Sequence, residues 1–282
     1  MRVLITGGSG FTGQYLSNQL IQTGHEIKNL ASNLVDLDDL EVELRSFKPN
    51  SIVHLAGISS VLHKSANDFY DVNLIGTRNI LSAIASNCTN IDSVILASTA
   101  HVYDTKKNGP ISETSVIDPA SDYAVSKYAM ERMAKLWSKS IPIVVTRPFN
   151  YTGRGQSTNF VIPKIVNHFK HKDFEIQLGD TKLYREFGDV RDVVDIYAMM
   201  VERPPIGEVL NICTGHYHKL DDIIKLCGEL SSHRLKVKTN PAFLRPGEPE
   251  KVFGDSSKLI KYFPEIKFRG IRSTLSWMFN DS

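Results

Sequence analysis

Short runs of branched apolar residues alternate with amphipathic segments along the first half of the chain. Because these runs are short and bounded by turn residues, they predict buried strands rather than helices. Strands are expected at residues 2–5, 25–30, 51–56, 93–98 and 143–146. Helices are expected after residue 10 and at residues 79–86 and 123–138. The alternation predicts an α/β fold, a doubly wound parallel sheet of the Rossmann type.

The alternation becomes less regular after Arg147-Pro148. Glycine and proline become more frequent there, although one further sheet strand is expected at residues 209–213. We therefore expect a dinucleotide-binding domain over residues 1–150 and a smaller C-terminal α/β substrate lobe mainly over residues 151–282. Residues from about 180 to 213 are expected to return to the first domain.

A glycine-rich segment lies between the first strand and the helix that follows it. It reads Thr6-Gly-Gly-Ser-Gly-Phe-Thr-Gly13, a G-x-x-G-x-x-G spacing. Glycine tolerates positive φ angles and lets a pyrophosphate approach the backbone, while the N–H groups at a helix start bind the anion. An ordinary glycine-rich turn is the alternative interpretation. The position between strand and helix favours dinucleotide binding.

Three side chains that suit proton transfer follow further along. Tyr123 and Lys127 are four residues apart on an expected helix and therefore share a face. A nearby ammonium stabilises a phenolate, so we expect Lys127 to lower the pKa of Tyr123. Thr99 follows the fourth strand, at the sheet edge where ligands of open α/β sheets bind, and its hydroxyl can orient a carbonyl oxygen. The alternative is a surface Tyr and Lys on an amphipathic helix.

Composition narrows the class of protein. The 282 residues carry 33 basic and 31 acidic side chains, and this near balance gives no case for nucleic-acid binding. The three cysteines are far apart, which supports neither a disulfide framework nor a metal site. The chain has no apolar run of membrane-spanning length and no signal-peptide pattern. A cytoplasmic protein without a membrane partner is expected.

These motifs together resemble the extended short-chain dehydrogenase/reductase family over essentially the whole chain. The resemblance rests on the glycine segment, Asp36-Leu37, His54-Leu-Ala-Gly57, Asn73-Leu-Ile-Gly-Thr77, Ser98-Thr-Ala-His-Val-Tyr103 and Tyr123-Ala-Val-Ser-Lys127. It implies an NAD(P)-dependent oxidoreductase with Thr99, Tyr123 and Lys127 as catalytic residues. The implied cofactor contacts are Gly7, Gly10, Phe11, Thr12, Gly13, Asp36, Leu37, Leu55, Ala56, Gly57, Tyr123 and Lys127.

The second half is similar to family members that act on nucleotide-linked sugars. The similar segments begin at Arg147-Pro-Phe-Asn-Tyr-Thr-Gly, Arg185-Glu-Phe-Gly-Asp and Leu244-Arg-Pro-Gly-Glu. The resemblance implies a GDP-linked sugar as substrate, with contacts from Asn150, Arg185, Arg245 and Glu248. Arginines bind phosphate in fork geometry, and a carboxylate accepts hydrogen bonds from ribose hydroxyls. Ion pairing with neighbouring acids is the alternative for Arg185 and, more strongly, for Arg191.

The residues after Thr99 exclude one reaction. A 4,6-dehydratase needs a carboxylate there, whereas this chain has Ala100 and His101. We therefore expect reduction of the C4 ketone of a GDP-linked 4-keto-6-deoxy hexose or heptose, in deoxysugar synthesis for a surface polysaccharide. A C4 epimerase with bound NAD and a non-catalytic dinucleotide sensor are the alternatives. His101 is a further candidate for substrate contact, or else a neutral hydrogen-bonding residue.

Two expectations concern the cofactor and assembly. NAD-preferring folds place an acid after the second strand, but residues 29–33 hold none, so NADPH is favoured and NADH stays open. No arginine occupies the segment either, and Lys28 is the nearby cation. The resemblance also implies a homodimer formed through helices that include residues 123–138. On that helix Met130, Met133 and Trp137 share a face and fit either a subunit contact or the core.

Overall fold

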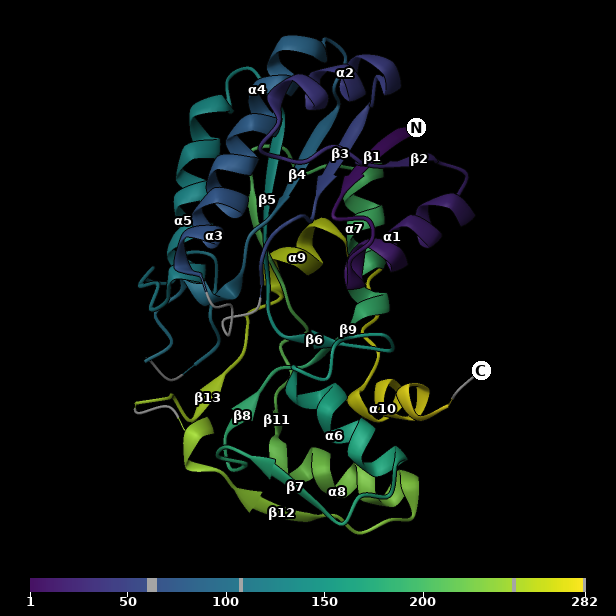
Figure 1. Ribbon diagram of the computed structural model, residues 1–282, viewed down its shortest axis with the longest axis vertical. Helices are drawn as coiled ribbons and strands as arrows, with labels where there is room; N and C mark the ends of the chain where they lie inside the picture. Colours follow the sequence, from purple (N-terminus) through teal and green to yellow (C-terminus); the bar gives the residue numbers. More distant parts are fainter. Residues whose placement is uncertain (60–64, 107–108, 245–246, 281–282) are drawn as a thin grey trace.

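The computed structural model describes residues 1–59, 65–106, 109–244 and 247–280, and the statements below concern these residues. Its centre is a sheet of six parallel strands in the order β10-β5-β4-β3-β1-β2 (Figure 1). Every strand predicted from the apolar runs is confirmed. Their bounds are β1 (Arg2–Thr6), β2 (Glu26–Asn29), β3 (Ser51–His54), β4 (Ser93–Ala97), β5 (Ile143–Pro148) and β10 (Val209–Ile212).

Helices cover both faces of this sheet because successive side chains of each strand point to opposite sides. Val3 and Ile5 of β1 pack in one apolar cluster, whereas Leu4 packs in another on the opposite face. The first cluster includes α1 (Phe11–Gln22), α7 (Val190–Glu202) and α9 (Ser257–Tyr262). The second includes α2 (Leu37–Phe47), α4 (Thr77–Asn87) and α5 (Asp122–Ala134). The doubly wound fold expected from the sequence is confirmed.

The order of strands reverses direction beside β1. The chain passes from β1 to β2 on one side, and the later strands β3, β4 and β5 add on the other side. Such a switch point leaves a crevice at the carboxyl ends of the strands, where ligands of open α/β sheets bind. The segments that follow β1, β3 and β4 therefore meet at one edge.

One expected helix ends earlier than expected, and one observed helix was not expected. The helix expected at residues 123–138 ends as α-helix at Ala134 and continues as a 3₁₀ turn, η3 (Lys135–Trp137). The helix α2 is absent from the sequence-based expectations, although Leu40, Leu44 and Phe47 lie on one buried face. A short α3 (Ala66–Phe69) and a π-helical segment, η1 (Tyr70–Gly76), lead into α4.

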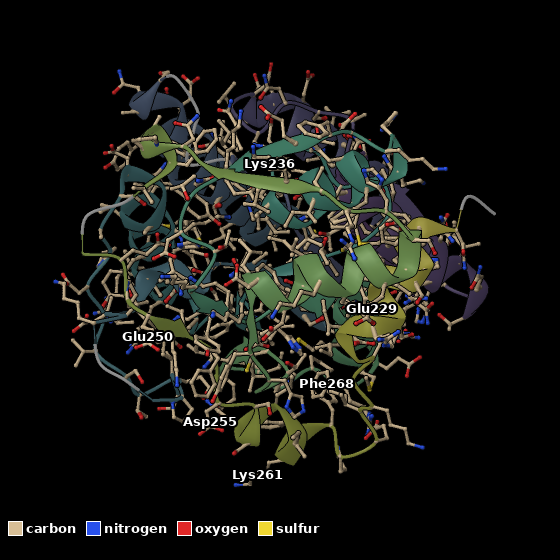
Figure 2. The ribbon with its side chains drawn as sticks, turned by 90° about the horizontal axis from the view of Figure 1, so that it is seen from below. Glu229, Lys236, Glu250, Asp255, Lys261 and Phe268 are labelled. Atoms are coloured by element: carbon tan, nitrogen blue, oxygen red, sulfur yellow. The ribbon has the colours of Figure 1, made fainter. Side chains whose placement is uncertain are left out.

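A second, smaller lobe has its own apolar core, below the sheet in Figure 1. It contains α6 (Val161–Lys170), α8 (Leu220–Ser231), α10 (Ile271–Phe279) and the pair β7 (Glu175–Leu178) and β12 (Lys236–Thr239). Figure 2 views this lobe from below, with Lys236 on β12 and Glu229 on α8. A three-stranded sheet lies above it, formed by β11 (His218–Lys219), β8 (Tyr184–Arg185) and β13 (Lys251–Val252).

Trp277 of α10 joins the two cores, since it packs against both apolar clusters. Its indole meets the ring of Tyr15 on α1 edge to face at 6.0 Å between centroids. The guanidinium of Arg191 lies 3.8 Å from the indole centroid, and that of Arg154 lies 5.0 Å away. The hydroxyl of Tyr15 donates to the carbonyl of Arg154 at 2.9 Å. This group, called the Trp277 contact below, fixes α1 to the second lobe.

Two remaining observations concern surfaces. Met130 is fully buried in the cluster under α4 and α5, and Met133 and Trp137 pack against that cluster, so this face of α5 belongs to the core.

In the part of the chain that the structure describes, no helix is both long and apolar enough to cross a bilayer.

Candidate active site

The glycine loop connects β1 to α1 in a geometry that only glycine fits. Gly7 has φ +70°, and its carbonyl accepts a hydrogen bond from the N–H of Gly10 at 2.9 Å. A Cβ on Gly13 would stand 2.3 Å from that same carbonyl oxygen. The helix begins at Phe11 without a side-chain cap, so its first N–H groups are available to an anion.

The segment after β3 supplies the opposite wall of this crevice. The hydroxyl of Thr6 accepts from the N–H of Ala56 at 3.1 Å, and the N–H of Leu55 donates to the carbonyl of Thr6. A Cβ on Gly57 would lie 2.9 Å from Nζ of Lys127. Glycine at position 57 therefore lets Lys127 approach the backbone that follows β3, and this close approach is called the cradle below.

Asp36 and Leu37 begin α2 on the far side of the glycine loop. The carboxylate of Asp36 caps this helix and accepts from the N–H of Asp39 at 3.1 Å. Leu37 is partly exposed as the first residue of the helix. Their role toward adenine stays a prediction.

Thr99, Tyr123 and Lys127 converge beyond this cradle. Thr99 follows β4, and its hydroxyl shares a hydrogen bond with the phenol of Tyr123. Tyr123 and Lys127 occupy adjacent turns of α5, and all three side chains are buried. The Nζ of Lys127 donates to the carbonyl of Ala97 at the end of β4, at 2.8 Å. The structure thus brings the three predicted catalytic side chains together.

The acidity of Tyr123 differs from the expectation. Burial raises its pKa to about 12, because loss of hydration of the phenolate outweighs the hydrogen bond from Thr99. Lys127 is not among the groups that shift this pKa, and its ammonium donates instead to the carbonyl of Ala97. Burial also lowers the pKa of Lys127 to about 8, against the opposing charge of Glu131. The expected lowering of the Tyr123 pKa is therefore wrong for the protein without ligands.

A buried polar network lies behind this site, and the sequence motifs did not include it. Glu131, one turn beyond Lys127, accepts from Arg147 Nε at 2.9 Å and from its Nη2 at 2.6 Å. Glu131 also accepts from the hydroxyl of Ser98, the residue before Thr99. The guanidinium of Arg147 continues to the hydroxyl of Tyr103 at 2.9 Å. The network therefore ties α5 to the ends of β4 and β5.

Ala100 and His101 begin the 3₁₀ turn η2 (Ala100–Val102) after Thr99. Ala100 is buried, whereas His101 is exposed and meets the ring of Tyr123 edge to face at 5.9 Å. The hydroxyl of Thr99 accepts from the N–H of His101 at 3.2 Å. His101 therefore lies beside Tyr123, the predicted proton donor.

Arg185 and Glu248 form a pair on the second lobe. Arg185, on β8, donates from Nη2 to Glu248 Oε1 at 2.8 Å and from Nη1 to the carbonyl of Glu250 at 3.2 Å. Asn150 is exposed after β5, and its carbonyl accepts from the N–H of Gly188, three residues after Arg185. Arg245 lies outside the described residues. Arg191 instead forms the expected ion pair, with Asp189 at 2.6 Å.

Tyr151 is a further side chain that the motifs did not indicate. It belongs to β6 (Tyr151–Thr152), which pairs with β9 (Gly188–Asp189) where the chain crosses to the second lobe. Its hydroxyl lies 2.7 Å from that of Thr12, and its ring stacks on Phe11 at 6.2 Å between centroids. Predicted cofactor contacts of the glycine loop thus pack directly on this crossing. No group of three or more metal-ligating side chains occurs within the described residues.

A doubly wound sheet with a glycine loop after β1 and a buried Tyr–Lys pair at the end of β4 defines an NAD(P)-dependent oxidoreductase. The chain belongs to the NAD dependent epimerase/dehydratase family, whose family model matches residues 3–213. It thereby belongs among the extended short-chain dehydrogenases/reductases, as the motifs indicated.

Two relatives span the whole chain. The chain is 33% identical to a GDP-6-deoxy-D-talose 4-dehydrogenase of Aggregatibacter actinomycetemcomitans, covering 100% of this chain and 98% of that protein. It is 29% identical to a GDP-6-deoxy-D-mannose reductase of Pseudomonas aeruginosa, covering 98% and 96%. Among solved structures, RMD from Pseudomonas aeruginosa complexed with NADPH superposes with a TM-score of 0.90 at 27% identity, covering 99% and 97%. These similarities support an enzyme that modifies a nucleotide-linked sugar.

Proposed function

We propose that this enzyme reduces the C4 ketone of a GDP-linked 4-keto-6-deoxy sugar with a hydride from NAD(P)H, as a GDP-4-keto-6-deoxy-D-mannose reductase does. The observation that carries the proposal is the buried group of Thr99, Tyr123 and Lys127 at the carboxyl ends of β3 and β4. Two full-length relatives whose names specify GDP-linked 6-deoxy sugars support the substrate class.

The protonated state of Tyr123 at neutral pH is the state that reduction requires. When bound, the dinucleotide supplies hydride chemistry at the carbonyl carbon. Tyr123 keeps its proton at neutral pH, because burial raises its pKa to about 12, and it donates that proton to the carbonyl oxygen. The hydroxyl of Thr99 orients the same oxygen. Lys127 holds the nicotinamide ribose beside the cradle at Gly57.

The neighbours of Thr99 argue against dehydration. Abstraction of a proton from C5 and loss of the C6 hydroxyl require acid–base groups in addition to the phenol of Tyr123. Ala100 has no proton to transfer, and the imidazole of His101 lies against the ring of Tyr123. Simple reduction needs only the proton donor that Tyr123 provides.

The second lobe offers the groups for a nucleoside diphosphate. The guanidinium of Arg185 on β8 pairs with the carboxylate of Glu248, which precedes β13, and both are partly exposed. A guanidinium suits diphosphate oxygens, and a carboxylate suits ribose hydroxyls. Asn150 is a third proposed contact. Arg245 is a fourth, proposed from the sequence alone because it lies outside the described residues.

The test is an assay with a ketone made in place. A GDP-mannose 4,6-dehydratase generates the 4-keto-6-deoxy sugar, the purified chain is added with NADPH or NADH, and absorbance at 340 nm is followed. We expect one dinucleotide oxidised per sugar reduced, and NMR of the product gives the C4 configuration. Interconversion of GDP-linked 6-deoxy sugars that differ only at the C4 alcohol, without net dinucleotide consumption, would instead establish a C4 epimerase. Absence of any conversion, with a known reductase active in parallel, would refute the proposal.

A further inference from the structure

A buried carboxylate from α2 occupies the loop that follows β2. Glu43 Oε2 accepts from the hydroxyl of Ser32 at 2.6 Å and from its N–H at 3.0 Å. Glu43 Oε1 accepts from the N–H of Ala31 at 3.1 Å. The ammonium of Lys28 lies 3.4 Å from the same carboxylate. Only 8% of the Glu43 side chain is exposed.

The backbone explains why this carboxylate is needed. The edge strand of the sheet is β2, and the N–H of Leu30 donates inward to the carbonyl of Ile5. The next N–H, that of Ala31, therefore points outward, away from the sheet. Glu43 satisfies it from α2, whose neighbouring residue Leu44 packs in the core and fixes the position of the helix.

The carboxylate is ionised at neutral pH. Burial opposes ionisation, but hydrogen bonds from Ser32 and Ala31 and the charge of Lys28 together lower the pKa of Glu43. A negative charge therefore lies permanently at the end of β2. In Rossmann folds this is the position of the adenosine ribose, where an acid binds the 2′-hydroxyl of NAD and a cation binds the 2′-phosphate of NADP.

We propose that Glu43 makes this enzyme select NAD(H) over NADP(H). The donors that a 2′-phosphate would use, namely two backbone N–H groups and the Ser32 hydroxyl, are already bound to Glu43. Lys28 is the only basic residue between positions 26 and 44, and Glu43 neutralises it. A 2′-phosphate would therefore meet hydrogen-bond donors and an ammonium that are already paired with Glu43, and its negative charge would be added beside the carboxylate.

This inference deepens the proposed function by naming the dinucleotide, and it rests on the cofactor site of that function. The sequence favours NADPH because no acid directly follows β2. The structure supplies an acid at the same place from α2. Glu43 lies 12 residues after Ala31 and 11 residues after Ser32, and it binds the N–H groups of both. The selecting residue thus belongs to α2 rather than to the strand.

The experiment measures dinucleotide binding by calorimetry without any sugar, so it does not depend on the substrate assignment. We expect the wild-type enzyme to bind NADH at least about ten-fold more tightly than NADPH. Glu43→Gln keeps the size of the side chain and removes its charge. It should tighten NADPH binding about ten-fold and change NADH binding by less than about three-fold.

Asp38→Asn is the matched control, since it removes one negative charge from an exposed position of the same helix. It should leave the ratio of the two affinities unchanged, and thermal unfolding should show that both variants are folded. Competition on the wild-type enzyme covers the case in which Glu43→Gln does not fold. There 5′-AMP should displace NADH better than adenosine 2′,5′-bisphosphate.

Three results would overturn the inference. One is wild-type enzyme that binds NADPH as tightly as NADH. A second is a folded Glu43→Gln variant with the wild-type affinity ratio, and a third is equal competition by the two adenosine nucleotides. Failure to bind either dinucleotide would refute the cofactor site itself, whereas a sugar that is not reduced would leave the binding result intact.

Discussion

The phenol of Tyr123 lies between a hydroxyl and two rings, with almost no contact to water. Thr99 provides the hydrogen bond, and Phe69 and His101 lie at centroid distances of 6.0 and 5.9 Å from its ring. In such surroundings the neutral phenol is the stable form, and its pKa rises to about 12. The phenol therefore keeps its proton throughout the physiological pH range, which is the state that the proposed donor role requires.

Tyr123→Phe tests this role at the scale of one atom. The ring and its packing remain, so dinucleotide affinity should be nearly unchanged. Positioned acid catalysis contributes about 10²–10⁴-fold, and kcat should fall by that factor. Steady-state kinetics and calorimetry measure the two quantities. A variant within a few-fold of wild-type kcat would remove Tyr123 from the mechanism.

Lys127 sets the upper limit of the pH profile. Burial lowers its pKa to about 8, so its ammonium loses the proton well below the ordinary pH for lysine. We expect kcat/KM for reduction to be constant below about pH 8 and to fall about ten-fold per pH unit above it. In Lys127→Arg the charge persists to much higher pH. The decrease of kcat/KM above about pH 8 should disappear in that variant, even if the rate is lower. The same decrease in the variant would mean that a group other than Lys127 causes it.

Arg185 tests the class of substrate. A charge-assisted contact to a diphosphate contributes about 1.5–3 kcal/mol, so Arg185→Ala should raise KM for the GDP-linked sugar about ten- to a hundred-fold. Its affinity for the dinucleotide should not change. Arg272→Ala is the control, because Arg272 forms an exposed pair with Glu229 on the same lobe. An unaltered KM in Arg185→Ala would mean that Arg185 and Glu248 form an ion pair that does not bind the substrate.

At the scale of elements, one carboxylate joins three segments that carry the site. Glu131 on α5 holds Ser98 at the end of β4 and Arg147 at the end of β5. Glu131 and Arg147 are both buried, with 8% and 6% of their surfaces exposed. Two charges removed from water depend on each other, because either one alone has no solvent to stabilise it.

Glu131→Gln should therefore destabilise the fold strongly. Removal of one partner from a buried pair costs about 3–5 kcal/mol, and the loss is measured by urea unfolding. Glu41→Gln breaks the exposed i, i+4 pair with Arg45 and should cost at most about 1 kcal/mol. Equal stability losses in the two variants would contradict the role of the buried network.

The sequence predicted the elements whose pattern is local and missed those that depend on distant partners. Apolar runs located all six strands of the central sheet, and the i, i+4 spacing placed Tyr123 and Lys127 on one face. Glu131 continues that face by one more turn, a signal available in the sequence. Its partner Arg147 lies 16 residues away, and no periodicity connects the two.

Charge and acidity were harder to predict than position. The pKa of Tyr123 depends on how completely the folded chain excludes water, which spacing does not reveal. Glu43 reaches the loop after β2 only because α2 packs beside it, so reading the residues after the strand could not find this acid. Both cases concern burial and contacts made by folding.

At the scale of the whole molecule, the family resemblance implies a homodimer through helices that include α5, and α4 packs beside α5, so we expect an interface on both. The buried face of α5 packs in the core, so a partner would meet the opposite side, where Val125 of α5 and Leu136 of η3 are exposed by 38% and 82%. Leu136→Glu should shift the protein toward monomer in sedimentation velocity at micromolar concentration. Monomeric wild-type protein under these conditions would contradict the expectation.

Phe174→Glu is the control for that measurement. Phe174 is 76% exposed, like Leu136, but it precedes β7 on the second lobe. A dimer through α4 and α5 predicts that this change leaves sedimentation unaltered. Dissociation by Phe174→Glu and not by Leu136→Glu would assign the interface to the second lobe.

The Trp277 contact has a consequence for how the chain is made. A ribosome releases α1 among the first segments and Trp277 among the last of the described residues, yet Trp277 packs on Tyr15 and against Arg154. A nascent chain that already contains β10 can pair every strand of the central sheet while α1 still lacks this cover. The helix behind the glycine loop therefore receives this cover only after α10 has been made, later than every strand of the central sheet.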